Sequence, residues 1–189
     1  MGRMTRTLRA LVAVALVAAA FAVARTEPPE EVAFAPFVVR VEVGDVGEGR
    51  GLQGAVDGAL LADEVTLDDW TGDTTGVWLV VHTRMATTEN PSLAYATLDV
   101  GERRWTASTR PGLRAMNSAG LDAGLPMAGS FAFELPADVA DQAAARSATL
   151  RLAAEGDPRL RTVIETELDL TELAHEGVFE IAPKERIRW

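Results

Sequence analysis

Val77-Trp78-Leu79-Val80-Val81-His82-Thr83-Arg84-Met85 is a run of β-branched and large apolar residues near the middle of the 189-residue chain. Such runs predict β-strands when they are bounded by Gly, Pro, Asp or Asn. We expect this run to form a central strand of the fold. The Trp78 side chain is expected to be buried between two sheets.

Similar short runs follow one another along most of the chain after residue 36. Some alternate apolar and polar residues: Phe131, Phe133 and Leu135 share one face, and Glu134 lies on the other. Alternation of this kind predicts one buried and one solvated face. Further strands are expected at residues 37–43, 60–67, 93–100, 104–107, 130–135, 149–153, 162–168 and 176–181.

Helical sequence is scarce in this part of the chain. Only residues 55–64 and 137–146 have a helix-forming composition, and the second segment follows Pro136. Neither segment is long enough to connect parallel strands across a sheet, so antiparallel pairing is expected. The predicted fold is an all-β, immunoglobulin-like antiparallel β-sandwich of about seven to nine strands, preceded by an apolar leader helix.

The N-terminus is organised as an export leader. Arg3, Arg6 and Arg9 precede fifteen consecutive apolar residues at 10–24. A basic segment followed by an apolar one is the layout of a signal peptide, and it places the following domain outside the cytoplasm. Residues 1–25 fit either a cleaved signal peptide or an uncleaved signal anchor, which would be a transmembrane helix in the cell membrane.

The rest of the chain divides into three parts by composition. Residues 26–35 are rich in Pro and Glu and are expected to be an extended linker. Residues 36–182 contain the predicted sandwich. Residues 183–189 form a short basic and aromatic tail on a protein that is otherwise acidic.

Charge and composition exclude several classes of function. The formal net charge is −10, which disfavours binding to nucleic acid. The chain has no cysteine, so it has no thiol nucleophile, no disulfide, no lipid-modified cysteine and no cysteine-bound metal. Arginine far outnumbers lysine and alanine is abundant, a bias typical of GC-rich genomes that favours an actinobacterial source.

Three motifs together are similar to those of a known family: Gly76-Val77-Trp78-Leu79-Val80-Val81, Arg104-Trp105-Thr106-Ala107-Ser108 and Phe131-Ala132-Phe133-Glu134-Leu135-Pro136. They resemble uncharacterised immunoglobulin-like domains of exported actinobacterial and Gram-positive proteins, which are similar in fold to small secreted mycobacterial antigens. The resemblance covers about residues 36–170. It implies an extracellular interaction module without catalytic activity.

Two motifs have the composition of ligand sites but not their context. Gly49-Arg50-Gly51-Leu52-Gln53-Gly54 matches G-x-G-x-x-G, yet no second βαβ unit follows it, so we interpret it as a glycine-rich loop. An acidic run lacks the spacing of a calcium-binding loop and is interpreted as a solvated strand edge: Asp63, Glu64, Asp68, Asp69 and Asp73.

Catalytic residues are equally scarce. His82 and His175 are the only histidines, and neither has a metal-binding spacing. No serine lies in a Gly-x-Ser-x-Gly motif. We therefore expect no enzyme activity, no cofactor and no metal, and we expect His82 to be partly buried at the end of a sheet. A cleft that joins either histidine to carboxylates would instead favour an enzyme.

The sequence favours a non-catalytic extracytoplasmic interaction module that binds an envelope or membrane protein through its loops or an exposed strand edge. The alternative is a ligand- or glycan-binding accessory domain associated with a membrane transporter. A groove lined by a tryptophan would favour that alternative. The residues expected to contact a partner are Trp70, Trp105, Lys184, Arg186, Arg188 and Trp189.

The leader makes the first testable prediction. Residues 1–35, fused to a reporter that is active only outside the cytoplasm, are expected to give activity. Replacement of Arg3, Arg6 and Arg9 by Glu is expected to reduce export. The positive charges keep the first residues on the cytoplasmic side, and this orientation is what directs the following chain outward. A reporter that stays in the cytoplasm with the unmodified leader would contradict the assignment.

Overall fold

The computed structural model describes residues 6–25, 34–117 and 119–189. The chain divides into two units, residues 1–35 and residues 36–189. The first unit contains one helix, α1 (Arg6–Ala24). Among the described residues no helix is long and apolar enough to cross a membrane, so the transmembrane helix considered above is not found. Most of the expected linker at 26–35 lies outside the described residues.

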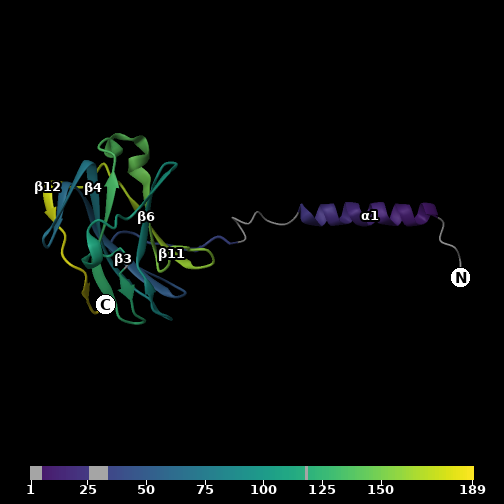
Figure 1. Ribbon diagram of the computed structural model, residues 1–189, viewed down its shortest axis with the longest axis horizontal. Coiled ribbons are helices and arrows are strands. Elements are labelled where there is room, and N and C mark those ends of the chain that lie inside the picture. The colour runs from purple at the N-terminus through teal and green to yellow at the C-terminus, as the bar shows by residue number, and fades with distance from the viewer. Residues whose placement is uncertain (1–5, 26–33, 118) are drawn as a thin grey trace. The chain divides into compact units, whose positions relative to one another are not determined.

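Residues 36–189 form a β-sandwich, shown with its strands labelled in Figure 1. The five-stranded sheet has the order β1 (Phe37–Arg40), β11 (Thr162–Leu168), β10 (Ala148–Ala153), β6 (Tyr95–Val100) and β7 (Arg103–Thr106). The six-stranded sheet has the order β12 (His175–Glu180), β3 (Leu52–Leu67), β4 (Trp70–Ala86), β9 (Met127–Leu135) and β13 (Glu185–Arg186), and β2 (Val46–Gly49) also pairs with β3. A small third sheet joins β5 (Ser92–Leu93) to β8 (Gly120–Leu121).

The predicted all-β sandwich is confirmed, with three corrections of detail. The described residues form thirteen strands, more than the seven to nine expected. Two edge strands pair in parallel, β1 with β11 and β12 with β3. Residues 55–64, considered helical, lie inside β3, because their backbone pairs with β4 between Asp73 and Arg84.

The second helical segment is shorter and tighter than an α-helix. Residues 137–146 contain two 3-10 helices, η2 (Val139–Asp141) and η3 (Ala143–Ser147), and a third, η1 (Gly112–Arg114), lies in another connection. The buried Val139 and Ala145 side chains join the main core. These turns therefore close one part of the core and do not cover a sheet.

The main hydrophobic core lies between the two large sheets. The six-stranded sheet contributes Leu79, Phe131 and Phe133, and the five-stranded sheet contributes Leu98 and Leu150; all of these are fully buried. The alternation predicted for β9 is confirmed, because Phe131, Phe133 and Leu135 face this core while Glu134 lies on the other face. Burial of such side chains supplies most of the stabilisation of a domain this size.

Strand β4 is apolar on both faces, and this changes the position expected for Trp78. Side chains alternate along a strand, so Val77, Leu79 and Val81 face the main core while Trp78 and Val80 point the opposite way. Trp78 is 0% exposed, as predicted, but it is buried on the outer face of the sheet and not between the sheets.

The outer cluster around Trp78 is closed by other parts of the chain. The Trp78 indole Nε1 donates a 2.9 Å hydrogen bond to the Gly72 carbonyl. Trp70 packs edge-on against the Trp78 ring, with ring centroids 6.0 Å apart. The Arg110 guanidinium lies 5.4 Å from the centroid of the Trp78 ring. Ile181, which follows β12, completes the cover. A second, smaller core therefore stabilises the outer face.

The outer face of the five-stranded sheet is held by charges instead. Glu165 on β11 forms ion pairs with Arg40 on β1 at 3.2 Å and with Arg151 on β10 at 2.7 Å. Arg151 also bonds Asp99 on β6, which accepts from Arg104 on β7 at 2.6 Å. The hydrogen bond from Arg104 lowers the pKa of Asp99. This ladder of alternating charge crosses all five strands and favours their observed register.

The outer core makes a testable prediction. Trp78→Ala removes a buried aromatic side chain and its hydrogen bond, so the free energy of unfolding is expected to fall by about 3–5 kcal/mol. Chemical denaturation monitored by circular dichroism measures this change. Leu113→Ala, at a side chain that is 86% exposed, is the control and should change stability by less than about 0.5 kcal/mol. Equal stability of the two variants would contradict the assignment of a second core.

Candidate functional site

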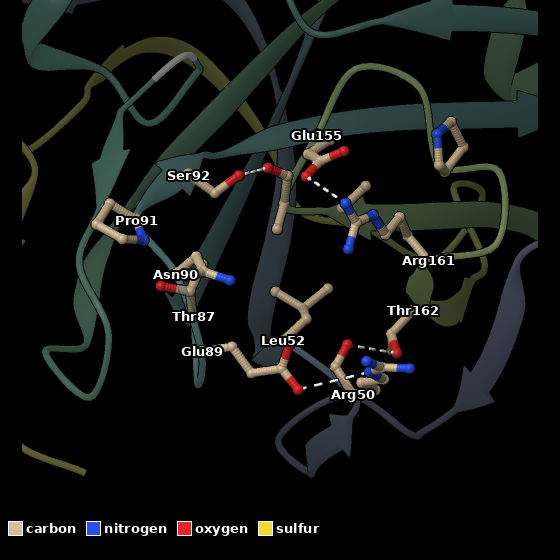
Figure 2. A pocket seen from close by; sticks show the side chains of 14 residues that line it. Arg50, Leu52, Thr87, Glu89, Asn90, Pro91, Ser92, Glu155, Arg161 and Thr162 are labelled. Atoms are coloured by element: carbon tan, nitrogen blue, oxygen red, sulfur yellow. Dashed lines mark hydrogen bonds and ion pairs between the residues drawn. The ribbon is translucent and has the colours of Figure 1, made fainter.

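A pocket of about 200 Å³ lies at one end of the sandwich (Figure 2). Three connections that are distant in sequence line it: the turn between β2 and β3, the segment after β4 and the segment between β10 and β11. Leu52 and Ala153 provide its apolar wall. The sequence did not predict this pocket, because only strand pairing brings the three connections together.

The glycine-rich motif forms the first of these connections. Gly49 and Leu52 pair across a hairpin whose turn is Arg50-Gly51, and Gly51 has the positive φ of 78° that such a turn favours. A Cβ on Gly49 would lie 2.4 Å from a side-chain carbon of Thr162, so only glycine permits this approach. Thr162 Oγ1 donates to the Arg50 carbonyl at 2.9 Å. The motif therefore shapes a hairpin turn at the pocket.

Two loose ion pairs lie on either side of Leu52 in Figure 2. Arg50 approaches Glu89 at 3.5 Å, and Arg161 approaches Glu155 at 3.4 Å. Both pairs are solvent-exposed, so each contributes little to stability. The charged side chains that line the pocket are thus two cations and two anions, and their formal charges cancel.

A buried hydroxyl also lines the pocket. Thr87 is 1% exposed, and its Oγ1 has no hydrogen-bond partner among the described residues. Nearby, Ser92 Oγ donates to the Ala154 carbonyl and keeps acceptor capacity. A buried hydroxyl without a partner carries a free-energy cost, which a polar group entering the pocket would reduce.

Two of the three tryptophans expected at a partner surface, Trp70 and Trp105, lie on different sheets. Trp70, on β4, packs in the outer core against Trp78. Trp105, on the edge strand β7, packs against the main core. Both are half-buried, and they pack against different hydrophobic clusters. The two rings therefore do not form one paired platform of the kind that stacks on a sugar.

The C-terminal tail is part of the sandwich. β13 pairs with β9, Lys184 N–H donates to the Arg114 carbonyl at 2.8 Å, and Ile187 N–H donates to the Pro126 carbonyl at 2.9 Å. The side chains are engaged as well: Lys184 bonds the Leu113 carbonyl, Arg186 pairs with Asp122 at 2.5 Å, and the Arg84 guanidinium lies 5.0 Å from the Trp189 ring.

Of the four tail residues expected to contact a partner, three are thus engaged within the domain. Arg188 is exposed. The pairing of β13 with β9 and the backbone hydrogen bonds to Arg114 and Pro126 join residues 183–189 to the sandwich. A role in partner binding stays a prediction for these side chains.

His82 lies on the outer face of the six-stranded sheet, close to the C-terminal segment that pairs with β9. Its Nδ1 is 2.8 Å from Ser130 Oγ, and its ring lies 5.7 Å from that of Phe179 on β12. A hollow of about 170 Å³ beside it is also lined by Asp57 and Glu185. The prediction of a partly buried histidine is confirmed. Burial lowers its pKa below the ordinary value of 6.5, against an opposing effect of the Asp57 charge.

These residues do not form a hydrolase triad. The Asp57 carboxylate accepts three hydrogen bonds from Arg84 at 2.6–2.9 Å, and it makes none with His82. A triad needs the carboxylate on the second imidazole nitrogen. The other histidine, His175, pairs with Asp63 at 2.8 Å on the exposed surface. Neither arrangement joins a base, an accessible nucleophile and an orienting acid.

Strand β12 ends the six-stranded sheet. The strand predicted at 176–181 is present as His175–Glu180, and all residues of β12 except Phe179 are exposed. Val178, near its centre, is 60% exposed. Its pairing with β3 uses one edge of the strand, so the backbone groups of the other edge are available to a further strand.

Comparison with known proteins supports the fold. No family model matches the sequence, and no curated protein matches it either. An uncharacterised β-sandwich protein from Clostridium difficile has 11% identity and a TM-score of 0.50, with 75% of this chain and 99% of that chain covered. A candidate lipoprotein from Staphylococcus aureus has 13% identity and a TM-score of 0.44, with 74% and 97% covered. At these identities, the first likeness shows the β-sandwich fold alone.

His82 predicts how stability depends on pH. Its pKa is lower in the folded than in the unfolded protein, so its contribution is complete above pH 6.5 and is lost as the pH falls below that value. Thermal unfolding between about pH 7 and 5.5 is expected to show a falling melting temperature. His82→Gln should flatten this slope, whereas the control Leu113→Ala, at an exposed side chain that does not titrate, should keep it. A slope unchanged by His82→Gln would contradict the assignment.

Proposed function

We propose that this protein is a non-catalytic, extracytoplasmic interaction module of the cell envelope, and that it binds an extended segment of an envelope protein along strand β12. The observation that carries the proposal is the open edge of this strand. An edge strand presents unpaired N–H and C=O groups, which another chain can use to add a strand to the sheet.

The side chains of β12 define the chemistry of the partner. Glu176, Val178 and Glu180 are alternate residues, so they share one face of the strand. All three are exposed. A partner strand beside them gains most when an apolar side chain lies next to Val178 and basic side chains lie next to the two glutamates. The partner is therefore an extended segment with a basic-x-apolar-x-basic pattern.

The site of action rests on the leader. Arg3, Arg6 and Arg9 with the apolar residues 10–24 favour export, and the apolar stretch falls within α1. The resemblance to immunoglobulin-like domains of exported actinobacterial and Gram-positive proteins supports the same location. A β-sandwich without an assembled catalytic centre among its described residues suits a role in recognition.

Site-specific photo-crosslinking tests this proposal. A photoreactive residue at position 178 of the full-length chain, expressed in the native host, is expected to give one discrete adduct with an envelope protein. The double variant Glu176→Lys/Glu180→Lys should reduce the adduct yield about fivefold, since it places like charges opposite the basic partner.

Two controls make the result specific. Glu102→Lys reverses an exposed charge in the β6–β7 turn and should leave the adduct unchanged. A photoreactive residue at position 113, which is more exposed than position 178, should not give the same adduct. An adduct that survives reversal of both glutamates, or that forms equally from position 113, would rule out recognition through β12.

A further inference from the structure

We propose that the pocket in Figure 2 binds a free zwitterionic small molecule of the α-amino acid class. None of the residues that line it belongs to β12. The inference is therefore independent of the proposed function.

The arrangement of charge points to a ligand with one charge of each sign. Arg50 with Glu89 and Arg161 with Glu155 lie on either side of Leu52. A ligand with a single charge that replaces one partner of a pair leaves the displaced partner without a counter-ion. A zwitterion inserted between Arg161 and Glu155 places its carboxylate on the arginine and its ammonium on the glutamate, so every charge keeps a partner.

The two ion pairs are loose enough to exchange. Each is a single contact of 3.4 or 3.5 Å. In contrast, Arg84 holds Asp57 through contacts of 2.6–2.9 Å from two guanidinium nitrogens, and Arg104 holds Asp99 at 2.6 and 2.8 Å. Guanidinium has five N–H donors, so most donors of Arg50 and Arg161 are available to a ligand. The weak coupling of exposed pairs makes this exchange inexpensive.

Thr87 provides an independent indication of a ligand. Thr87 lines the pocket, and its hydroxyl is buried and has no partner among the described residues. A hydroxyl can both donate to a carboxylate and accept from an ammonium, so either end of a zwitterion satisfies it. Leu52 adds an apolar wall for a small side chain.

The size of the pocket limits the ligand. Its volume of about 200 Å³ lies below the range of about 300–1,000 Å³ that is typical of pockets for drug-sized ligands. A free amino acid with a small side chain therefore suits this pocket better than a larger ligand does.

Titration of the full chain with matched probes tests the proposal by amide chemical shifts in NMR. L-alanine carries both charges, L-lactate only the negative charge and L-alaninamide only the positive charge. L-alanine is expected to shift the amides of Gly51, Leu52 and Glu155, with a dissociation constant on the order of 1 mM. L-lactate and L-alaninamide should each bind at least about tenfold more weakly, because each lacks one of the two ion pairs.

Variants separate the pocket from other sites. Arg161→Gln and Glu155→Gln each remove one charge at an exposed position and should weaken L-alanine binding about tenfold. Glu102→Gln, in the β6–β7 turn, and Arg103→Gln, at the start of β7, make the same changes elsewhere and should have no effect. The absence of shifts at the pocket, or equal binding of L-lactate or L-alaninamide, would overturn the proposal. Unchanged binding by Arg161→Gln and Glu155→Gln would do so as well.

Discussion

The structure depends on covering both faces of one strand. Residues 77–81 of β4 are all buried, and their alternate side chains enter two different cores. Apolar groups on both faces must be removed from water for the strand to be stable. The five-stranded sheet covers one face. The other face is covered by Trp70, by Ala115 in the β7–β8 connection and by the chain from Phe179 to Ile181, so the C-terminal segment is part of the folding requirement.

The outer faces of the two sheets are stabilised by different interactions. The six-stranded sheet buries Trp78 and its neighbours under additional chain. The five-stranded sheet is not covered in this way; instead its five strands are linked by the ladder from Arg40 through Glu165, Arg151 and Asp99 to Arg104. Surface ion pairs contribute little one at a time, but a network that shares its members fixes the register of neighbouring strands. Since the ladder and the outer core occupy the outer faces of the two sheets, the strand edges and the ends of the sandwich are the surfaces left for binding a partner.

The sequence was informative where residues alternate and uninformative where they do not. Strands 149–153 and 162–168 were located closely because their polar and apolar residues are sorted by face. Trp78 was assigned to the wrong face because the run at 77–81 is apolar throughout, and no alternation distinguishes its two sides. Residues 55–64 are rich in Ala and Leu, which favour a helix, but pairing with β4 overrides this local preference. The pocket was missed because its charged residues are about forty and seventy positions apart.

The open edge of β12 is best understood by comparison with β9. The side of β9 that does not pair with β4 is covered by other parts of the chain. β13 pairs with it, Met116 N–H donates to the Ser130 carbonyl, and Ser108 N–H donates to the Ala132 carbonyl. Within the part of the chain that the structure describes, β12 receives no such cover, and it carries Glu176 and Glu180 along its exposed face. Charged residues on an edge disfavour pairing between two copies, since self-pairing would bring four carboxylates to one seam. They do not disfavour a strand with basic side chains. An edge that repels its own copy and attracts an opposite charge selects for a different partner, which is the property that an interaction module requires.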